Sequence, residues 1–229
     1  MPGGRPARTG PDQWQDTQRE YESRVKPATD VPPNTISNLR HLGSLSGVTS
    51  YYAAGCGSGS TGTRLAVTPT ASFLRAFPLI CPPYPSRINE LSFHIRTASA
   101  STNASIGAYR NAGEGNLFPG GLIIQSGAIS TDSTGIKTLP CNILCAPGEI
   151  LWLAGYNNSG VPVWSGQNRS TVGNTMIGVE DRTAVATETA AGHSVAWTSI
   201  AMPATFPTAG RLEHTGNFVS LFAHFAVVR

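Results

Sequence analysis

The sequence predicts an all-β protein: an antiparallel, jelly-roll-like β-sandwich that follows an extended N-terminal arm with room for one short helix. Strand and turn signals alternate along most of the chain, many of them at a spacing of about 8–12 residues, which is typical of sandwiches and jelly rolls. The 25 glycines and 17 prolines are residues that form turns. Only 13% of the residues are charged, against roughly 25% in an ordinary soluble domain, which suits a part packed into an assembly.

Residues 1–45 differ from the rest because 11 of the 29 charged side chains lie there. Residues 11–25 have the pattern of one helix, in which Trp14, Tyr21 and Val25 form a narrow apolar stripe. Such a helix is marginal in isolation, and large aromatic side chains are typical of docking contacts. We therefore expect an arm that anchors the chain on another protein; the alternative is a loose terminus.

Residues 46–229 are expected to form one β-sandwich domain. The strand candidates are rich in β-branched and aromatic residues and are bounded by turn residues. They are, in chain order, Val48–Tyr52, Arg64–Val67, Phe73–Ile80, Ile88–Arg96, Ser105–Arg110, Leu122–Ile124, a strand that starts at Ile150, Val161–Trp164, Thr175–Val179, Val195–Ile200 and Phe218–Val228.

The alternation of apolar and polar residues, and the position of a proline, predict where some of these strands lie in the sheets. Within Ile88–Arg96 the apolar residues are expected inward and the polar ones, such as Ser92, outward. Val161–Trp164 is expected at a sheet edge, because Pro162 has no N–H to donate to a central ladder. Phe218–Val228 is apolar on both faces and is expected to be a central strand.

Two segments, 105–127 and 140–156, share an arrangement in which a turn leads into an apolar strand. In the first, glycines after Asn111 supply the turn, and Leu117–Gly120 is expected to close it, with Pro119 fixing φ and Gly120 taking a positive φ. In the second, a turn at Pro147 and Gly148 is expected to start the strand at Ile150.

These segments, which read Ile-Gly-Ala-Tyr…Gly-Glu-Gly-Asn-Leu-Phe-Pro-Gly and Pro-Gly-Glu-Ile-Leu-Trp-Leu-Ala, resemble β-sandwich domains of bacteriophage tail-fibre, collar and capsid-decoration proteins. The resemblance covers roughly residues 50–229 and is one of pattern. It implies a non-enzymatic structural protein of a phage virion, made in the host cytoplasm. It further implies that the arm binds other virion proteins and that the chain forms a homotrimer, since the resembled domains are commonly trimers.

The pattern of histidines, glycines and acidic residues predicts that the protein is not an enzyme and binds no cofactor and no metal. The five histidines stand apart, without the spacing of metal ligands. The glycine-rich stretch Gly57–Gly62 lacks the lysine of a phosphate-binding loop. Glu180 and Asp181 are the only adjacent acids, so a polysaccharide-degrading enzyme, which needs a carboxylate pair, is the weaker alternative.

A carbohydrate- or receptor-binding module of a tail fibre is the second alternative. Aromatic faces beside amide side chains are the groups that bind sugars, and the central part of the chain holds four suitable rings: Tyr109, Trp152, Tyr156 and Trp164. The competing interpretation is that these rings belong to the core.

Neither nucleic acid nor membrane is an expected partner. The net charge is +3, but the sequence has no run of Lys and Arg residues that could bind along a phosphate backbone. It also has no apolar run of the roughly 18–20 residues needed to span a bilayer. Four cysteines are expected to be buried free thiols. Cys141 and Cys145 would lie about 13 Å apart along one strand, too far to bond to each other, and disulfides are the alternative in a virion that meets an oxidising exterior.

Overall fold

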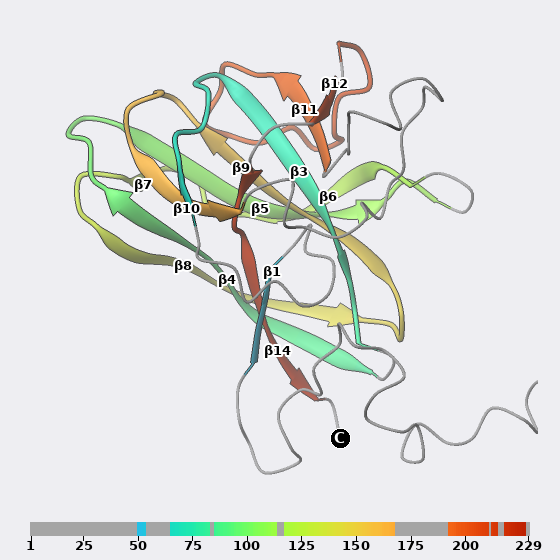
Figure 1. Cartoon of the computed structure of the whole chain (residues 1–229). Coiled ribbons are helices and arrows are strands. Elements are labelled where there is room, and N and C mark those ends of the chain that lie inside the picture. Colours follow the sequence, from blue (N-terminus) through green and yellow to red (C-terminus); the bar gives the residue numbers. More distant parts are fainter. Residues whose placement is uncertain are drawn as a thin grey trace, which may run out of the picture. The chain divides into compact units, whose positions relative to one another are not determined.

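The computed structural model describes residues 50–53, 65–82, 85–113, 117–167, 192–210, 212–214 and 218–227. These residues form two antiparallel sheets and no helix, which confirms the predicted all-β, sandwich-like class (Figure 1). The described part accordingly contains no helix long and apolar enough to cross a membrane. The chain divides into two compact units, Met1–Ile36 and Ser37–Arg229, and every described residue belongs to the second.

The first sheet, sheet A, is built around a long strand, β4. Its strands are β1 (Ser50–Ala53), β2 (Leu65–Val67), β4 (Ser86–Thr97), β8 (Gly135–Cys145), β10 (Val163–Gln167), β13 (Phe218–Val219) and β14 (Phe222–Val227). One edge of β4 pairs with β8, from Ser86 opposite Cys145 to Ile95 opposite Gly135. The other edge pairs with β14 and then with β10, so β4 lies between β8 and β14 in Figure 1.

The second sheet, sheet B, has the order β12-β11-β3-β9-β5-β6, with β7 also paired to β5. Its strands are β3 (Phe73–Ile80), β5 (Asn103–Asn111), β6 (Pro119–Gln125), β7 (Ile129–Ser130), β9 (Ile150–Asn157), β11 (Gly192–Ala196) and β12 (Leu212–His214). The chain changes sheets repeatedly, for example between β3 and β4, between β4 and β5, and on either side of β9. Neighbours within a sheet are therefore mostly distant in sequence.

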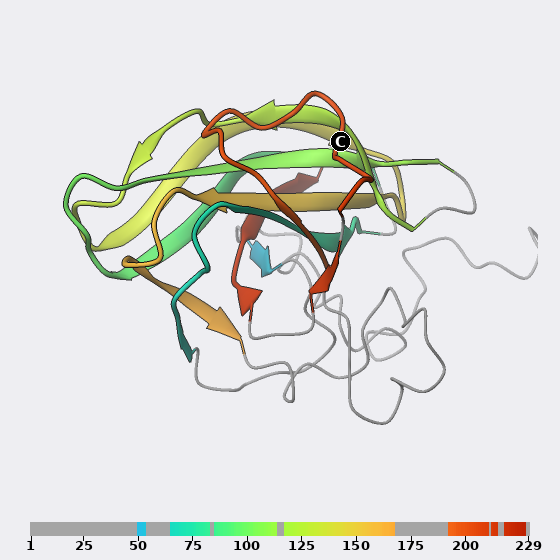
Figure 2. The same cartoon turned by 90° about the horizontal axis from the view of Figure 1, so that it is seen from above.

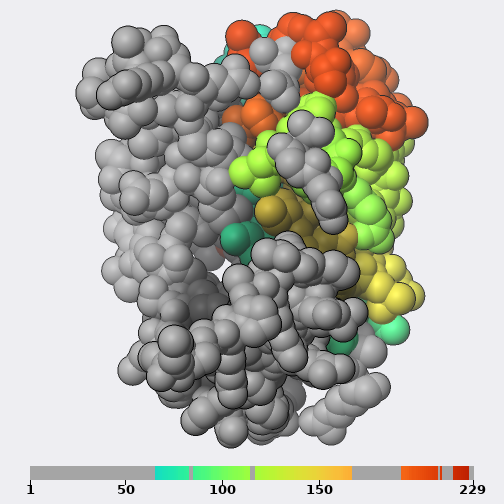
Figure 3. Space-filling view, turned by 90° about the vertical axis from the view of Figure 1, so that its right-hand side faces the viewer, coloured from blue at the N-terminus to red at the C-terminus, as the bar shows by residue number. Residues whose placement is uncertain are grey.

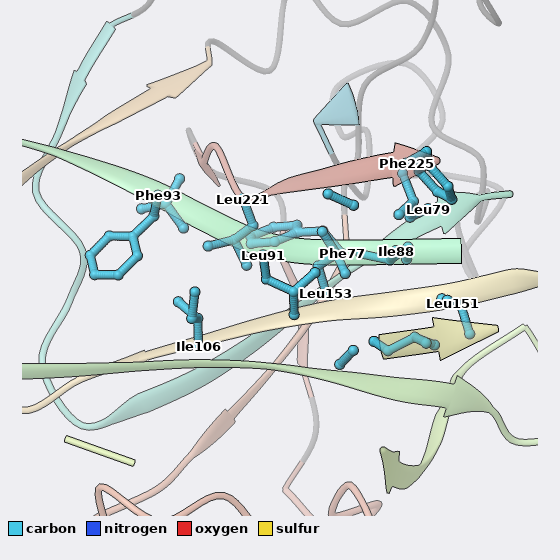
Figure 4. Close-up of a cluster of buried hydrophobic side chains, with 14 of the residues drawn as sticks. Phe77, Leu79, Ile88, Leu91, Phe93, Ile106, Leu151, Leu153, Leu221 and Phe225 are labelled. Carbon is cyan, nitrogen blue, oxygen red and sulfur yellow. The ribbon is translucent and has the colours of Figure 1, made fainter. Parts of the chain in front are cut away.

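The inner core fills the space between the two sheets. Alternate side chains of both sheets meet there, because successive residues of a strand point to opposite faces. Figure 4 shows the centre of this cluster, which includes Phe77, Leu79, Ile88, Leu91, Phe93, Ile106, Leu151, Leu153, Leu221 and Phe225. The burial of Leu91, Phe93 and Ile95 confirms the face that the sequence predicts for them.

A second apolar cluster, the outer cluster, covers the face of sheet B that points away from sheet A. Its buried members are Leu74, Ala76, Tyr109, Trp152, Ala154, Tyr156, Val195, Met202 and Phe206. The last two come from residues 197–210, a segment without strands that runs across β6 and β5 (Figure 2) and lies beside β6 at the surface (Figure 3).

Backbone hydrogen bonds fix this covering segment: Leu122 N donates to Ala204 O at 2.8 Å, and Phe206 N donates to Gly120 O at 2.9 Å. Gly107 permits the close contact, because a Cβ there would lie 2.5 Å from Ile124 O and 2.9 Å from Met202 Sδ. Sheet B is thus buried on both faces, which explains why β9 is apolar at consecutive positions.

Several predicted strands are confirmed. Phe73–Ile80 has the predicted bounds, and Ile88–Arg96 forms most of β4. Gly148 takes a positive φ of 70° in the predicted turn before β9. The predicted strand Phe218–Val228 is divided into β13 and β14; β14 is central, since it pairs with both β1 and β4. The predicted strand Thr175–Val179 lies outside the described residues.

Three other predictions were wrong. Val161–Trp164 is not an edge strand: Pro162 precedes β10, so its missing N–H costs no ladder bond, and β10 pairs with β4, β2 and β13. Ser92 is buried, because β14 packs beside it. Strand β11 ends at Ala196, and the rest of Val195–Ile200 belongs to the covering segment.

The fourth error concerns the turn between β5 and β6. Pro119 and Gly120 do not close it but begin β6, and Gly120 is not among the glycines with positive φ. The turn is closed earlier, where Ala112 N donates to Phe118 O at 2.8 Å. Gly120 is needed for space instead, since a Cβ there would lie 2.9 Å from Ala112 Cα.

The two-sheet core makes a stability prediction. Leu153 is 1% exposed in the middle of the inner core, so Leu153→Ala should lower the free energy of unfolding by about 2–5 kcal/mol through lost burial and a cavity. Val161 is 63% exposed, so Val161→Ala should change the free energy of unfolding by less than about 0.5 kcal/mol. Denaturant unfolding measures both; equal effects would contradict the described core.

Candidate functional site

The four rings of the predicted carbohydrate site do not lie together. Tyr109 on β5 and Trp152 on β9 are directly opposite each other in the ladder, and with Tyr156 they belong to the outer cluster. Trp164 lies in the inner core, where its ring is 4.3 Å from that of Phe93. The exposed fractions of the four residues are 0%, 0%, 2% and 1%.

Tyr109 is fixed by the covering segment. Its hydroxyl donates a hydrogen bond to Pro203 O at 3.0 Å, and its ring meets that of Phe206 edge to face at 5.6 Å. Burial raises the pKa of the Tyr109 hydroxyl well above its ordinary value, because the charged phenolate is poorly solvated there. Tyr109 is therefore neutral and acts as a hydrogen-bond donor.

Asn111 holds the β5–β6 loop over Trp152. Its Oδ1 accepts hydrogen bonds from Trp152 Nε1 at 3.0 Å and from Phe118 N at 3.1 Å, and its Nδ2 donates to Gly113 O at 3.1 Å. The sequence marked Asn111 only as a turn former. Its position at the start of a glycine-rich loop was the available signal, but its link to an indole 41 residues away was not visible.

His193 on β11 completes the cluster. Its ring lies 5.2 Å from that of Trp152, tilted by 30°, and 6.1 Å from that of Phe118, nearly perpendicular. Its Nε2 is 3.5 Å from Leu117 O, and the residue is 5% exposed. His193 therefore packs with the aromatic residues, although the sequence presented it as an isolated histidine.

A sugar site needs an open ring face and free polar groups around it. In the outer cluster the rings are covered, so carbohydrate binding through Tyr109, Trp152 and Tyr156 would require residues 197–210 and the β5–β6 loop to move away. Binding by these rings and by Trp164 stays a prediction. The predicted anchoring residues Trp14, Tyr21 and Val25 lie outside the described residues.

Two buried polar side chains, Arg75 and Asn157, lie on the inner face of sheet B. Arg75 on β3 is 7% exposed; its Nη1 donates to Thr70 O at 3.2 Å, and its guanidinium lies 5.6 Å from the centroid of the Phe73 ring. Desolvation lowers the pKa of Arg75 to about 10. Asn157, opposite Phe73 in the ladder, has a buried side-chain amide with no hydrogen-bond partner among the described residues.

An ion pair lies near the end of the inner core, beside Cys81. Arg110 at the end of β5 forms an ion pair with Glu149, whose Oε2 also accepts a hydrogen bond from Ala146 N at 2.9 Å. The Arg110 side chain is 53% exposed, so the pair contributes little to stability. Within the residues that the structure describes, no group of three His, Cys, Asp or Glu side chains could hold a metal ion.

The Asn111–Trp152 contact can be tested by a double-mutant cycle. Asn111→Ala should lower the free energy of unfolding by about 1–3 kcal/mol, because it leaves a buried indole N–H without an acceptor. In the background of Trp152→Phe, which has no such donor, the same change should cost less. Asn142→Ala, at an exposed site on β8, is the control. A cost of Asn111→Ala that is equal in both backgrounds would contradict the assignment.

No family model matches the chain, and no curated protein matches it. The predicted resemblance to phage virion β-sandwich proteins therefore rests on the sequence of segments 105–127 and 140–156 alone and stays a prediction. In the structure these segments are β5 with its loop and β6, and the end of β8 with its turn and β9.

Proposed function

We propose that this chain is a non-enzymatic structural protein of a phage virion and that its β-sandwich is a jelly roll. The observation that carries the proposal is the strand order. Sheet A contains the run β1-β14-β4-β8, and sheet B contains the run β3-β9-β5-β6. Two four-stranded runs connected in this chain order support the proposal of an eight-stranded jelly roll.

This strand order agrees with the resemblance found in the sequence. Eight-stranded jelly rolls are used by viral capsid proteins and by lectins. An architecture supports a function only by analogy, so the proposal also draws on the low charge content and on the covered aromatic rings. A sandwich closed on both faces of sheet B is suited to a rigid building block.

Assembly with further copies of the chain is the second part of the proposal, and we place its contact on β8. The outward-facing residues of this strand are exposed, including Ile136 at 71% and Leu144 at 59%. Large aliphatic side chains that share one strand face gain free energy when a partner covers them. We propose that they pack against neighbouring copies in a homotrimer, while Trp14, Tyr21 and Val25 of the arm bind other virion proteins.

Removal of the arm tests the anchoring role. A chain that lacks residues 1–45 should keep its β-sheet circular dichroism and its oligomeric state, because the described sheets lie beyond the deletion. It should fail to join particles when it competes with the full chain during assembly. Sedimentation of purified particles followed by immunoblotting measures incorporation. Full incorporation of the truncated chain would contradict the anchoring role.

Substitution on β8 tests the homotrimer. The double variant Ile136→Lys, Leu144→Lys should shift the mass measured by light scattering from that of a trimer to that of a monomer, since two charges would be buried without partners. Val161→Lys changes an equally exposed aliphatic residue away from β8 and should leave the trimer intact. A monomeric full chain, or a trimer that survives the double substitution, would contradict this contact.

A further inference from the structure

Two cysteines lie at one end of the two-sheet core. Cys81 directly follows β3 of sheet B, and its backbone N donates to Glu149 O at 2.7 Å. Cys145 is the last residue of β8 in sheet A and is paired with Ser86 of β4. The connections that carry the chain between the sheets here, after Cys81 and after Cys145, are themselves joined, because Gly148 N donates to Pro82 O at 3.0 Å.

The two side chains are buried in the same apolar cluster. Cys81 is 1% exposed and Cys145 is 4% exposed, and both belong to the inner core. Both are free thiols, and each is close enough to the other to shift its pKa. The joined connections and the shared cluster bring the two cysteines together, and a disulfide requires their Cβ atoms to approach to about 3.5–4.5 Å.

Cys141 is placed differently, although it lies on the same strand as Cys145. Its Sγ donates to Ile88 O at 3.4 Å, so it faces the neighbouring strand of its own sheet. Cys145 lies four positions further along the strand, about 13 Å away by strand rise. Cys141 therefore serves as a matched control on the same strand.

We propose that Cys81 and Cys145 are a disulfide-forming pair that joins sheet B to sheet A when the chain meets a small-molecule disulfide such as oxidised glutathione. This inference is independent of the function proposed above. The sulfur of Cys145, after loss of its proton, attacks one sulfur of the small disulfide and releases one thiol. The sulfur of Cys81, after loss of its proton, then attacks Cys145 Sγ and releases the second thiol. Both cysteines are oxidised and the small disulfide is reduced to two thiols.

The environment of the pair assigns these roles. The neighbouring Cys81 lowers the pKa of the Cys145 thiol, and the neighbouring Cys145, together with burial, raises the pKa of Cys81. Cys145 is thus the first to become a thiolate, the form that attacks disulfides. The pair titrates as a unit, so the rate of oxidation should rise with pH.

The test uses the full chain and counts free thiols. The reduced protein is treated with oxidised glutathione, both when folded and during refolding from denaturant, so that burial of the thiols cannot hide the reaction. Remaining thiols are then alkylated in denaturant and located by peptide mass spectrometry. The expected product is a peptide pair linked through Cys81 and Cys145, and an increase in Tm on the order of 10 °C over the reduced chain.

Three variants make the assignment specific. Cys141→Ser should form the same linked peptides and show the same Tm increase. Cys81→Ser and Cys145→Ser should each lose the linked peptides and the Tm increase. The reduced forms of both variants should remain folded by circular dichroism. A wild-type chain that keeps both thiols free under both treatments would overturn the proposal. So would a linkage that pairs either cysteine with Cys141, or a Cys81→Ser variant that still gains the Tm increase.

Discussion

Burial of sheet B on both faces is the constraint on which the rest of this structure depends. One face packs on sheet A through the inner core, and the other is covered by residues 197–210 and the β5–β6 loop. Strand β9 lies in the middle of this arrangement, where residues 151–157 are all buried. Apolar burial is the main favourable term in folding, and a strand buried on both faces gains it at every residue.

This constraint also decides what the aromatic residues do. Rings at the surface of a sandwich are available to ligands. The polar atoms of Tyr109 and Trp152 instead donate hydrogen bonds to Pro203 and Asn111 of the same chain. Buried polar groups that are satisfied internally specify one arrangement of the surrounding segments. The outer cluster thus fixes two irregular segments on a regular sheet, and we interpret it as structural.

Much of the sheet framework could be predicted from the sequence, because a strand and its turn are local features. Phe73–Ile80 has β-branched and aromatic residues next to turn residues, and Gly148 follows a proline. The covering segment could not be predicted, because residues 197–210 have no regular period and their partners lie about 80–100 residues earlier. Proximity of Cys81 and Cys145 was equally hidden, since it follows from how two sheets are stacked and not from spacing along the chain. The turn before β6 was misjudged because Pro119 and Gly120 are common in turns, and only the contact with Ala112 shows their actual role.

The position of β14 has a consequence for how the molecule is made. Residues 222–227 pair with β1 on one side and with β4, some 130 residues earlier, on the other. Before these residues have left the ribosome, β4 exposes an unpaired edge and the inner core lacks Phe225. A nascent chain in this condition offers a template for wrong strand pairing between neighbouring polysomal copies. Closure of sheet A therefore waits until residues 222–227 have been synthesised and have left the ribosome.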